Sequence, residues 1–198
     1  AESLAGRKIE YHLYPLTFME YLEQTSGQVN KYNIIETLTT GLVSFTSKTL
    51  MFDLHASLER VLIYGLYPYL VEHPGDTDYL INLSDSVIFK DILELDLIEN
   101  RRVALDLLKL LAHQIGNLIS YSELSRTLGI DSRTIKKYIE IFEQSYIIFR
   151  LYPYSKNGRD EIGKSPKIYF HDLGLRNALI NDFSSPFLRR DNGAIFEN

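Results

Sequence analysis

The chain has 198 residues, of which 45% are hydrophobic, enough to bury one sizeable core or two small ones. It contains no cysteine, which excludes disulfides and thiolate metal sites, and no apolar run approaches the length that spans a bilayer. No signal peptide is visible, and the first residue is Ala1 rather than Met, as in a piece of a longer protein. We therefore expect part of a cytoplasmic protein with no membrane partner.

The net charge of −5 is distributed unevenly along the chain. Residues 101–172 carry 12 Lys and Arg against 8 Asp and Glu, whereas residues 1–100 carry 6 against 15. Residues 173–198 are balanced, with 3 of each sign. Only the segment 101–172 could therefore attract phosphate groups, and its positive excess is modest for a nucleic-acid-binding protein. An ordinary solvated helix face explains the same charges equally well.

The first half of the chain predicts one strand and several helices. Residues 8–14 alternate polar and apolar side chains and end at a proline, which predicts a strand. Thr17 can cap a following helix over residues 18–22. Residues 32–71 have an interrupted helical pattern, and residues 89–115 are strongly apolar at helical spacing, which predicts a long buried helix.

Two helices joined by a tight turn are predicted next along the chain. Ser120 and Glu123 have the spacing of a capping box, so a helix begins there. Gly129 ends it, because a residue without a Cβ takes the left-handed conformation of a helix end without strain. Asp131 or Ser132 then caps the second helix.

The second of these helices has an apolar face and a charged face. The apolar residues recur at the 3.6-residue period: Ile135, Tyr138, Ile139 and Phe142. The opposite face holds charged residues: Arg133, Lys136, Lys137 and Glu140. Residues 147–152 and 167–171 then predict two strands, joined by a loop rich in Lys, Arg and Gly. With the helix at 89–115 as its first helix, this arrangement predicts a winged helix.

In a winged helix that binds DNA, the exposed face of the second helix and the hairpin loop meet the phosphates and the major groove. The residues that we expect to bind nucleic acid are basic ones on that face and in that loop: Arg133, Lys136, Lys137, Lys156, Arg159 and Lys164. The alternative is an ordinary helix surface, because Lys136 and Glu140 have the spacing of a common i, i+4 ion pair.

The same loop contains a letter-for-letter match to the phosphate-binding pattern G-x-x-x-x-G-K-[ST], at residues 158–165. That motif requires a preceding strand and a helix that starts at its Lys-Ser step. Pro166 and a β-rich run follow instead, and Asp160 and Glu161 would place carboxylates beside the phosphates. We therefore predict the tip of a hairpin here and no nucleotide site.

Several short runs, in this order and spacing, make the chain similar to the C-terminal part of a prokaryotic AAA+-type ATPase family. In that family, a region of unknown function that contains a winged helix follows the ATPase core. The runs that carry the resemblance span nearly the whole chain: residues 4–7, 13–18, 65–68, 91–92, 121–125 and 164–175. The resemblance implies that the P-loop and the Mg²⁺-binding strand precede Ala1. ATP and Mg²⁺ would then bind to the whole protein, and this chain alone would not hydrolyse ATP.

The resemblance also bears on two single residues. Arg7 lies at the end of the implied ATPase core, where its guanidinium could contact a nucleotide phosphate, although we favour an ordinary surface arginine. Glu197 would be the first acidic residue of a nuclease-type α/β region that follows in the family. One carboxylate cannot hold a metal ion, and the five histidines show no metal-ligand spacing. We therefore predict neither a catalytic nor a metal site in this chain.

These observations together predict a mainly α protein with a small β part. We expect the tail of the ATPase core in residues 1–27 and a helical connecting region in 28–100. The winged helix-turn-helix would occupy 101–172, and a truncated C-terminal domain would start in 173–198. The winged helix would bind double-stranded DNA or dock a partner, driven by the ATPase core. The alternative is a protein–protein interaction or oligomerisation module, which contacts the ATPase core or a second copy and never binds nucleic acid.

Overall fold

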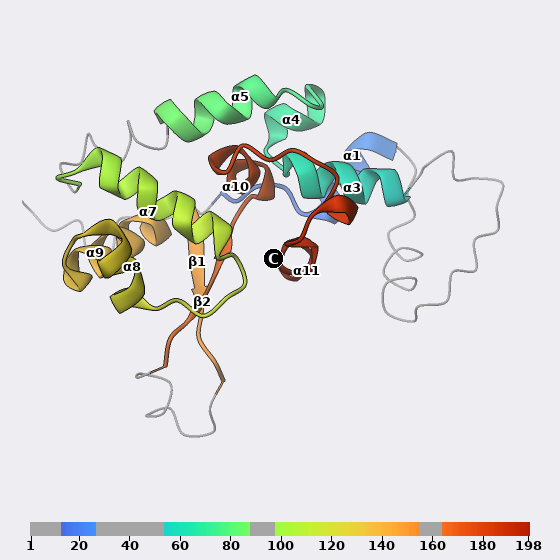
Figure 1. Cartoon of the computed structure of the whole chain (residues 1–198). Helices are drawn as coiled ribbons and strands as arrows, with labels where there is room; N and C mark the ends of the chain where they lie inside the picture. Colours follow the sequence, from blue (N-terminus) through green and yellow to red (C-terminus); the bar gives the residue numbers. More distant parts are fainter. Residues whose placement is uncertain (1–12, 27–53, 88–97, 155–163) are drawn as a thin grey trace, which may run out of the picture.

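The computed structural model describes residues 13–26, 54–87, 98–154 and 164–198. This part of the chain is mainly helical and has one small two-stranded sheet (Figure 1). Its elements, in chain order, are α1 (Phe18–Ser26), α3 (Leu54–Tyr64), α4 (Pro68–Glu72), α5 (Thr77–Asn82), the π-helix η1 (Leu83–Val87), α7 (Arg101–His113), α8 (Tyr121–Leu128), α9 (Ser132–Gln144), β1 (Ile148–Leu151), β2 (Lys167–Phe170), α10 (Leu173–Leu179), the 3₁₀ helix η3 (Pro186–Leu188) and α11 (Asn192–Glu197). None of the helices in the described segments has the length and apolar character that a membrane span requires.

The first described segment does not form the strand that the alternating pattern predicts. Residues 8–12 lie outside the described residues, and the prediction is wrong for Leu13 and Tyr14, which are not in a strand. The segment lies instead against the connection between α3 and α4, where the Leu16 N–H donates to the Leu66 carbonyl at 3.0 Å. Alternation of side chains could not reveal this long-range contact.

Helix starts follow the capping residues that the sequence predicts. At the start of α1, Thr17 Oγ1 accepts a hydrogen bond from the N–H three residues later, at 3.3 Å. Ser120 Oγ accepts from the N–H three residues later, also at 3.3 Å, and the Asp131 carboxylate caps α9 from an N–H at 2.6 Å. Gly129 ends α8 with a φ of 67°. These four predictions are confirmed, because each depends on local chemistry.

The helix expected at residues 89–115 is present in part as α7, which begins at Arg101. Residues 89–97 lie outside the described residues. Asn100 caps α7, since its side-chain oxygen accepts a hydrogen bond from the Val103 N–H at 3.2 Å. The apolar pattern runs through this position, so it did not reveal the cap.

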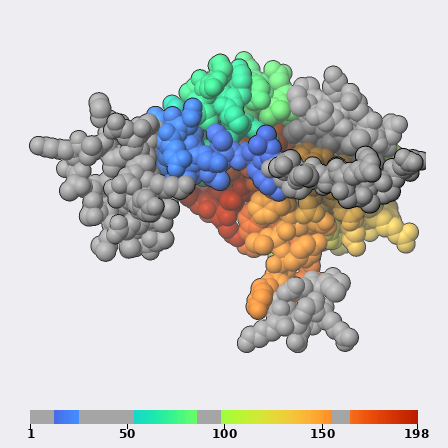
Figure 2. All heavy atoms as spheres, turned by 180° about the vertical axis from the view of Figure 1, so that it is seen from behind, coloured from blue at the N-terminus to red at the C-terminus, as the bar shows by residue number. Residues whose placement is uncertain are grey.

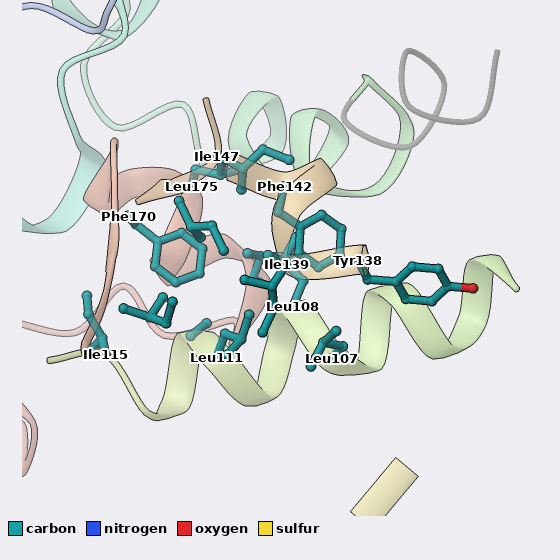
Figure 3. Packing of buried hydrophobic residues seen from close by; sticks show 14 of the residues in the cluster. Leu107, Leu108, Leu111, Ile115, Tyr138, Ile139, Phe142, Ile147, Phe170 and Leu175 are labelled. Atoms are coloured by element: carbon teal, nitrogen blue, oxygen red, sulfur yellow. The ribbon is translucent and has the colours of Figure 1, made fainter. Parts of the chain in front are cut away.

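The hydrophobic core lies against the apolar face of α7 (Figure 3). The apolar face of α9 packs on one side of α7, and side chains from β2 and α10 approach from another. The buried residues at its centre are Leu107, Leu108, Leu111, Ile115, Tyr138, Ile139, Phe142, Phe170 and Leu175. The burial that the sequence predicts for the apolar face of α9 is therefore confirmed. Leu62 and Ile195 belong to the same core, so side chains from three of the four expected domains pack together.

The two predicted strands are present as an antiparallel hairpin, in which Ile148 lies opposite Phe170 and both side chains are buried. Residues 116–119 lie along the other edge of β2. Further along that edge, the Asn198 amide accepts from the Phe170 N–H at 2.8 Å and donates to the Phe170 carbonyl at 2.9 Å. The sheet is small, but β2 has hydrogen-bonding partners along both edges.

The start of α10 packs directly on the end of α3. A Cβ added to Gly174 would lie 2.0 Å from the Tyr64 carbonyl oxygen, so only glycine allows this close approach. Asp172 caps α10 by accepting from the Leu175 N–H at 3.0 Å, and it also accepts from the Leu66 N–H at 2.6 Å. Burial raises the pKa of Asp172 to about 6, although the backbone N–H donors lower it in part. Asp172 therefore joins the two helices through one buried carboxyl group.

A buried group of charged side chains joins α10 to α7 and to the segment before α11. Arg176 donates to the Asp191 carboxylate at 2.6 Å and to the Ala112 carbonyl at 2.8 Å, and Arg189 donates to the same carboxylate at 2.8 Å. Burial alone would raise the pKa of Asp191, but the hydrogen bonds from Arg189 and Arg176 lower it to about 2. In the described part of the chain, no buried side-chain polar atom lacks a hydrogen-bond partner. The group is therefore structural, because its polar atoms have their partners within the fold.

Candidate nucleic-acid interface

Three of the six residues expected to bind nucleic acid lie together on the exposed face of α9. Arg133, Lys136 and Lys137 are exposed, and their i, i+3, i+4 positions are neighbours on a helix surface. We call these three residues the basic face. The opposite side of α9 is held in the core by its apolar residues, which fixes the rotation of the helix and so keeps the basic face outward.

The three cations of the basic face have different surroundings. Lys137 Nζ lies 3.5 Å from Glu99 Oε1, in an ion pair whose side chains are 48% and 85% exposed. Such an exposed pair is worth about 0–1 kcal/mol, so a phosphate could replace Glu99 at little cost. Lys136 Nζ lies 5.2 Å from the centroid of the Tyr121 ring, within the range of a cation–π contact. Arg133 forms no ion pair within the part of the chain that the structure describes.

Two exposed carboxylates lie on the same helix as the basic face. Asp131 is the N-cap of α9, and Glu140 follows Lys136 by one helical turn. Opposite charges at such short range reduce the potential that a distant phosphate experiences. These two carboxylates therefore reduce the positive potential of the basic face.

Arg150, at the base of the hairpin, is a cation near α9 that the sequence did not single out. Its Nε donates to Glu143 Oε2 at 2.9 Å, its backbone N–H donates to Glu143 Oε1 at 3.1 Å, and its side chain is 16% exposed. Burial alone would lower the pKa of Arg150, but hydrogen bonds with Glu143 and Tyr121 raise it above its usual value. Glu143 neutralises this permanent charge, and the ion pair between the two residues joins β1 to α9. The two residues lie on either side of a helix end, and no local sequence rule connects them.

The hairpin loop contributes one described residue to the predicted site. Lys164 is exposed just before β2, whereas Lys156 and Arg159 lie outside the described residues, as does Arg7. From Lys164 the chain continues directly into β2. A phosphate-binding loop would start a helix at this step, so the local structure is that of a hairpin.

Glu197, the residue that the family resemblance placed at the start of a nuclease-type region, is engaged in surface contacts. It accepts hydrogen bonds from Lys167 Nζ and from the Tyr169 hydroxyl, and so ties α11 to β2. The hydrogen bond from Lys167 lowers the pKa of Glu197. Among the described residues, no group of three or more His, Cys, Asp or Glu side chains could hold a metal ion.

Residues 55–185 match the family model of a domain of unknown function, DUF8612. The chain belongs to the DUF8612 family. The matched range contains every element from α4 to α10, and with them the whole basic face of α9. In this DUF8612 chain, Arg189, Asp191 and α11 lie beyond the matched range, although they complete the buried charged group and the edge of β2.

The DUF8612 chain is similar to several uncharacterised proteins. One from Haemophilus influenzae is 23% identical over 203 residues, which cover 99% of this chain and 46% of the relative. One from Methanocaldococcus jannaschii is 28% identical over 185 residues, covering 89% of this chain and 39% of the relative. One from Mycobacterium tuberculosis is 34% identical over 71 residues, which are 36% of this chain and 16% of the relative. The chain thus spans less than half the length of these relatives, and no solved structure matches it significantly.

Proposed function

We propose that this DUF8612 chain is a winged-helix module that binds double-stranded DNA. In this proposal, α7, α8 and α9 are the three helices, α9 is the recognition helix, and the β1–β2 hairpin is the wing. The observation that carries the proposal is the basic face, in which three exposed cations occupy adjacent positions on α9 while the other side of that helix is fixed in the core. A rigid helix with one exposed positive face is suited to the phosphates that border the major groove.

The positive field supports weak binding that depends on salt. Only the segment 101–172 has a positive excess, and the chain as a whole has a net charge of −5. Part of the basic charge is already paired, as in Lys137 with Glu99 and Arg150 with Glu143. A DNA phosphate can replace Glu99 as the partner of Lys137, because that ion pair is exposed, whereas Arg150 keeps its partner Glu143. We therefore expect few phosphate contacts and an affinity that falls as salt rises.

We further propose that the module belongs to a larger AAA+-type ATPase of the cytoplasm, whose ATP and Mg²⁺ bind elsewhere in the protein. The family resemblance of residues 164–175 and of the other short runs supports this assignment. The relatives are more than twice as long as their matched regions, which leaves room for an ATPase core. ATP-driven changes in that core would then move the DNA-binding face. Because the G-x-x-x-x-G-K-[ST] pattern at residues 158–165 leads into β2 and not into a helix, we expect no ATP hydrolysis from the chain alone.

A second candidate function is a protein–protein interaction or oligomerisation module without nucleic-acid binding. Exposed apolar side chains near α11 favour it, since Phe187, Leu188 and Phe196 are 46%, 85% and 47% exposed. The Phe187 ring lies 5.9 Å from the Phe196 ring and stacks on the His55 ring at 4.8 Å, measured between centroids. Seen from behind, the C-terminal residues lie between α1 and the hairpin (Figure 2). The ATPase core or a second copy could cover such a surface.

Fluorescence anisotropy with a short labelled duplex separates the two functions. The test variant replaces all three residues of the basic face by alanine. The control variant removes the same charge from exposed positions on α3, on α7 and before α11: Arg60, Lys109 and Arg190. If the module binds DNA, the wild type and the control bind at low salt and the test variant binds much more weakly. Absence of binding by the wild type, or equal loss in both variants, contradicts the proposal and favours the interaction module.

A further inference from the structure

Tyr121 connects the basic face to the base of the hairpin. It is the first residue of α8, it is half-buried, and it packs against the hydrophobic core. Lys136 Nζ, which belongs to α9, lies 5.2 Å from the centroid of its ring. The negative face of an aromatic ring attracts a cation, so this contact restrains the flexible lysine stem and places its charge beside α8.

The hydroxyl end of Tyr121 lies near the base of the hairpin. Its hydroxyl group interacts with the Arg150 guanidinium, which in turn is hydrogen-bonded to Glu143 at 2.9 Å. Arg150 also lies 5.9 Å from the centroid of the Tyr152 ring. Because Glu143 neutralises Arg150, this arginine positions Tyr121 and leaves Lys136 as the cation that is open to a ligand.

Two of the three side chains of the basic face are held by partners of their own. Base edges are read by Arg, Lys, Asn and Gln side chains that project freely into the groove. Lys136 is turned onto Tyr121 and Lys137 onto Glu99, so Arg133 is the basic-face residue without such a partner among the described residues. Lysine is a compact charge that suits a phosphate, and tyrosine hydroxyls commonly donate to phosphate oxygens.

We infer that Tyr121 and Lys136 together bind a phosphate of the DNA backbone, a contact that does not depend on the base sequence. The inference rests on the proposed DNA binding and adds to it a residue on α8 and the group of the DNA that it binds. In this arrangement, the ring holds the lysine, the lysine supplies the charge, and the hydroxyl donates a hydrogen bond to the same phosphate.

Anisotropy titrations with two duplexes of equal length, one rich in A·T pairs and one rich in G·C pairs, test the inference. A variant that loses a phosphate contact should bind both duplexes more weakly by the same factor, whereas loss of a base-reading contact would change the ratio of the two affinities by about 5- to 150-fold. Tyr121→Leu keeps apolar bulk but removes the ring and the hydroxyl, and it should weaken binding to both duplexes by about 2- to 5-fold. Lys136→Ala should weaken both equally and reduce the salt slope by about one. Lys109→Ala, at an exposed lysine of α7, is the control and should change neither quantity.

Each outcome has one meaning. A loss in Tyr121→Leu or Lys136→Ala that differs about tenfold or more between the two duplexes, or unchanged binding by folded Tyr121→Leu, overturns the inference and leaves DNA binding intact. If Tyr121→Leu does not fold, the equal or unequal loss for the two duplexes in Lys136→Ala still decides the question. If the wild type binds neither duplex, the proposed function fails and the inference fails with it.

Discussion

The contact between α10 and α3 predicts an unusually large effect for the smallest possible substitution, Gly174→Ala. The added Cβ would lie 2.0 Å from the Tyr64 carbonyl oxygen and 2.4 Å from its carbonyl carbon, and both belong to the backbone. No side-chain rotation can relieve the overlap, so α10 and α3 must separate by about 1 Å or more. That movement lengthens the hydrogen bond from the Leu66 N–H to Asp172, which is 2.6 Å in the folded chain.

The expected cost of Gly174→Ala follows from these terms. Overpacking costs about 1–3 kcal/mol, and a buried carboxyl that loses a donor costs about 1–3 kcal/mol more. Alanine in a helix recovers up to about 1 kcal/mol, so we expect a net loss of about 1–5 kcal/mol in the free energy of unfolding. Urea denaturation followed by circular dichroism measures it. Gly193→Ala, in α11, is the matched control, since a Cβ added there would meet no atom within 4 Å and the stability should stay equal or rise. A Gly174→Ala loss below about 0.5 kcal/mol would refute the close approach.

The other predictions concern stability. Burial raises the pKa of Asp172 to about 6, above its value in the unfolded chain, so the stability that its protonated form contributes is lost as pH rises through that value. From pH 8 to pH 5, the free energy of unfolding of the wild type should therefore rise by about 1.4 kcal/mol relative to Asp172→Asn. The reverse trend would contradict this prediction. Asp191→Ala removes the carboxylate that two buried arginines share and should lower the free energy of unfolding by about 3–5 kcal/mol in urea denaturation, against less than about 0.5 for the exposed Asp106→Ala. Phe142→Ala leaves a cavity in the core and should lower the free energy of unfolding by about 3–5 kcal/mol, whereas Lys136→Ala should lower it by at most about 0.5 kcal/mol. Equal losses in the two variants would mean that the buried and exposed faces of α9 are misassigned.

The local features of the fold could be predicted from the sequence. Ser120, Asp131 and Gly129 act within one helical turn, and the apolar period of α9 depends on neighbours three and four residues apart. The strand predicted at residues 8–14 failed at Leu13 and Tyr14, because contacts with a distant connection compete with a local alternation. Short alternating patterns carry little information when the partner strand is unknown.

The features that join distant segments could not be predicted from the sequence. Asp172 acts both as a helix cap and as an acceptor for the connection after α3, and only its first role has a local signal. For the candidate site, the sequence identified the exposed cations of α9 but neither the Tyr121 contact nor the pairing of Arg150 with Glu143. These partners meet because the core brings α8, α9 and β1 together.

The salt dependence of DNA binding is the measurement that tests the central claim most directly. If about three to five cations from the basic face and the hairpin loop neutralise phosphates, a plot of log affinity against log salt should have a slope of about −3 to −4.5. Replacement of the three residues of the basic face by alanine should reduce the steepness by about 2.7 without unfolding the chain, because these side chains lie opposite the buried face of α9. No measurable binding at low salt, or a slope that the triple replacement leaves unchanged, would contradict a DNA-binding face on α9.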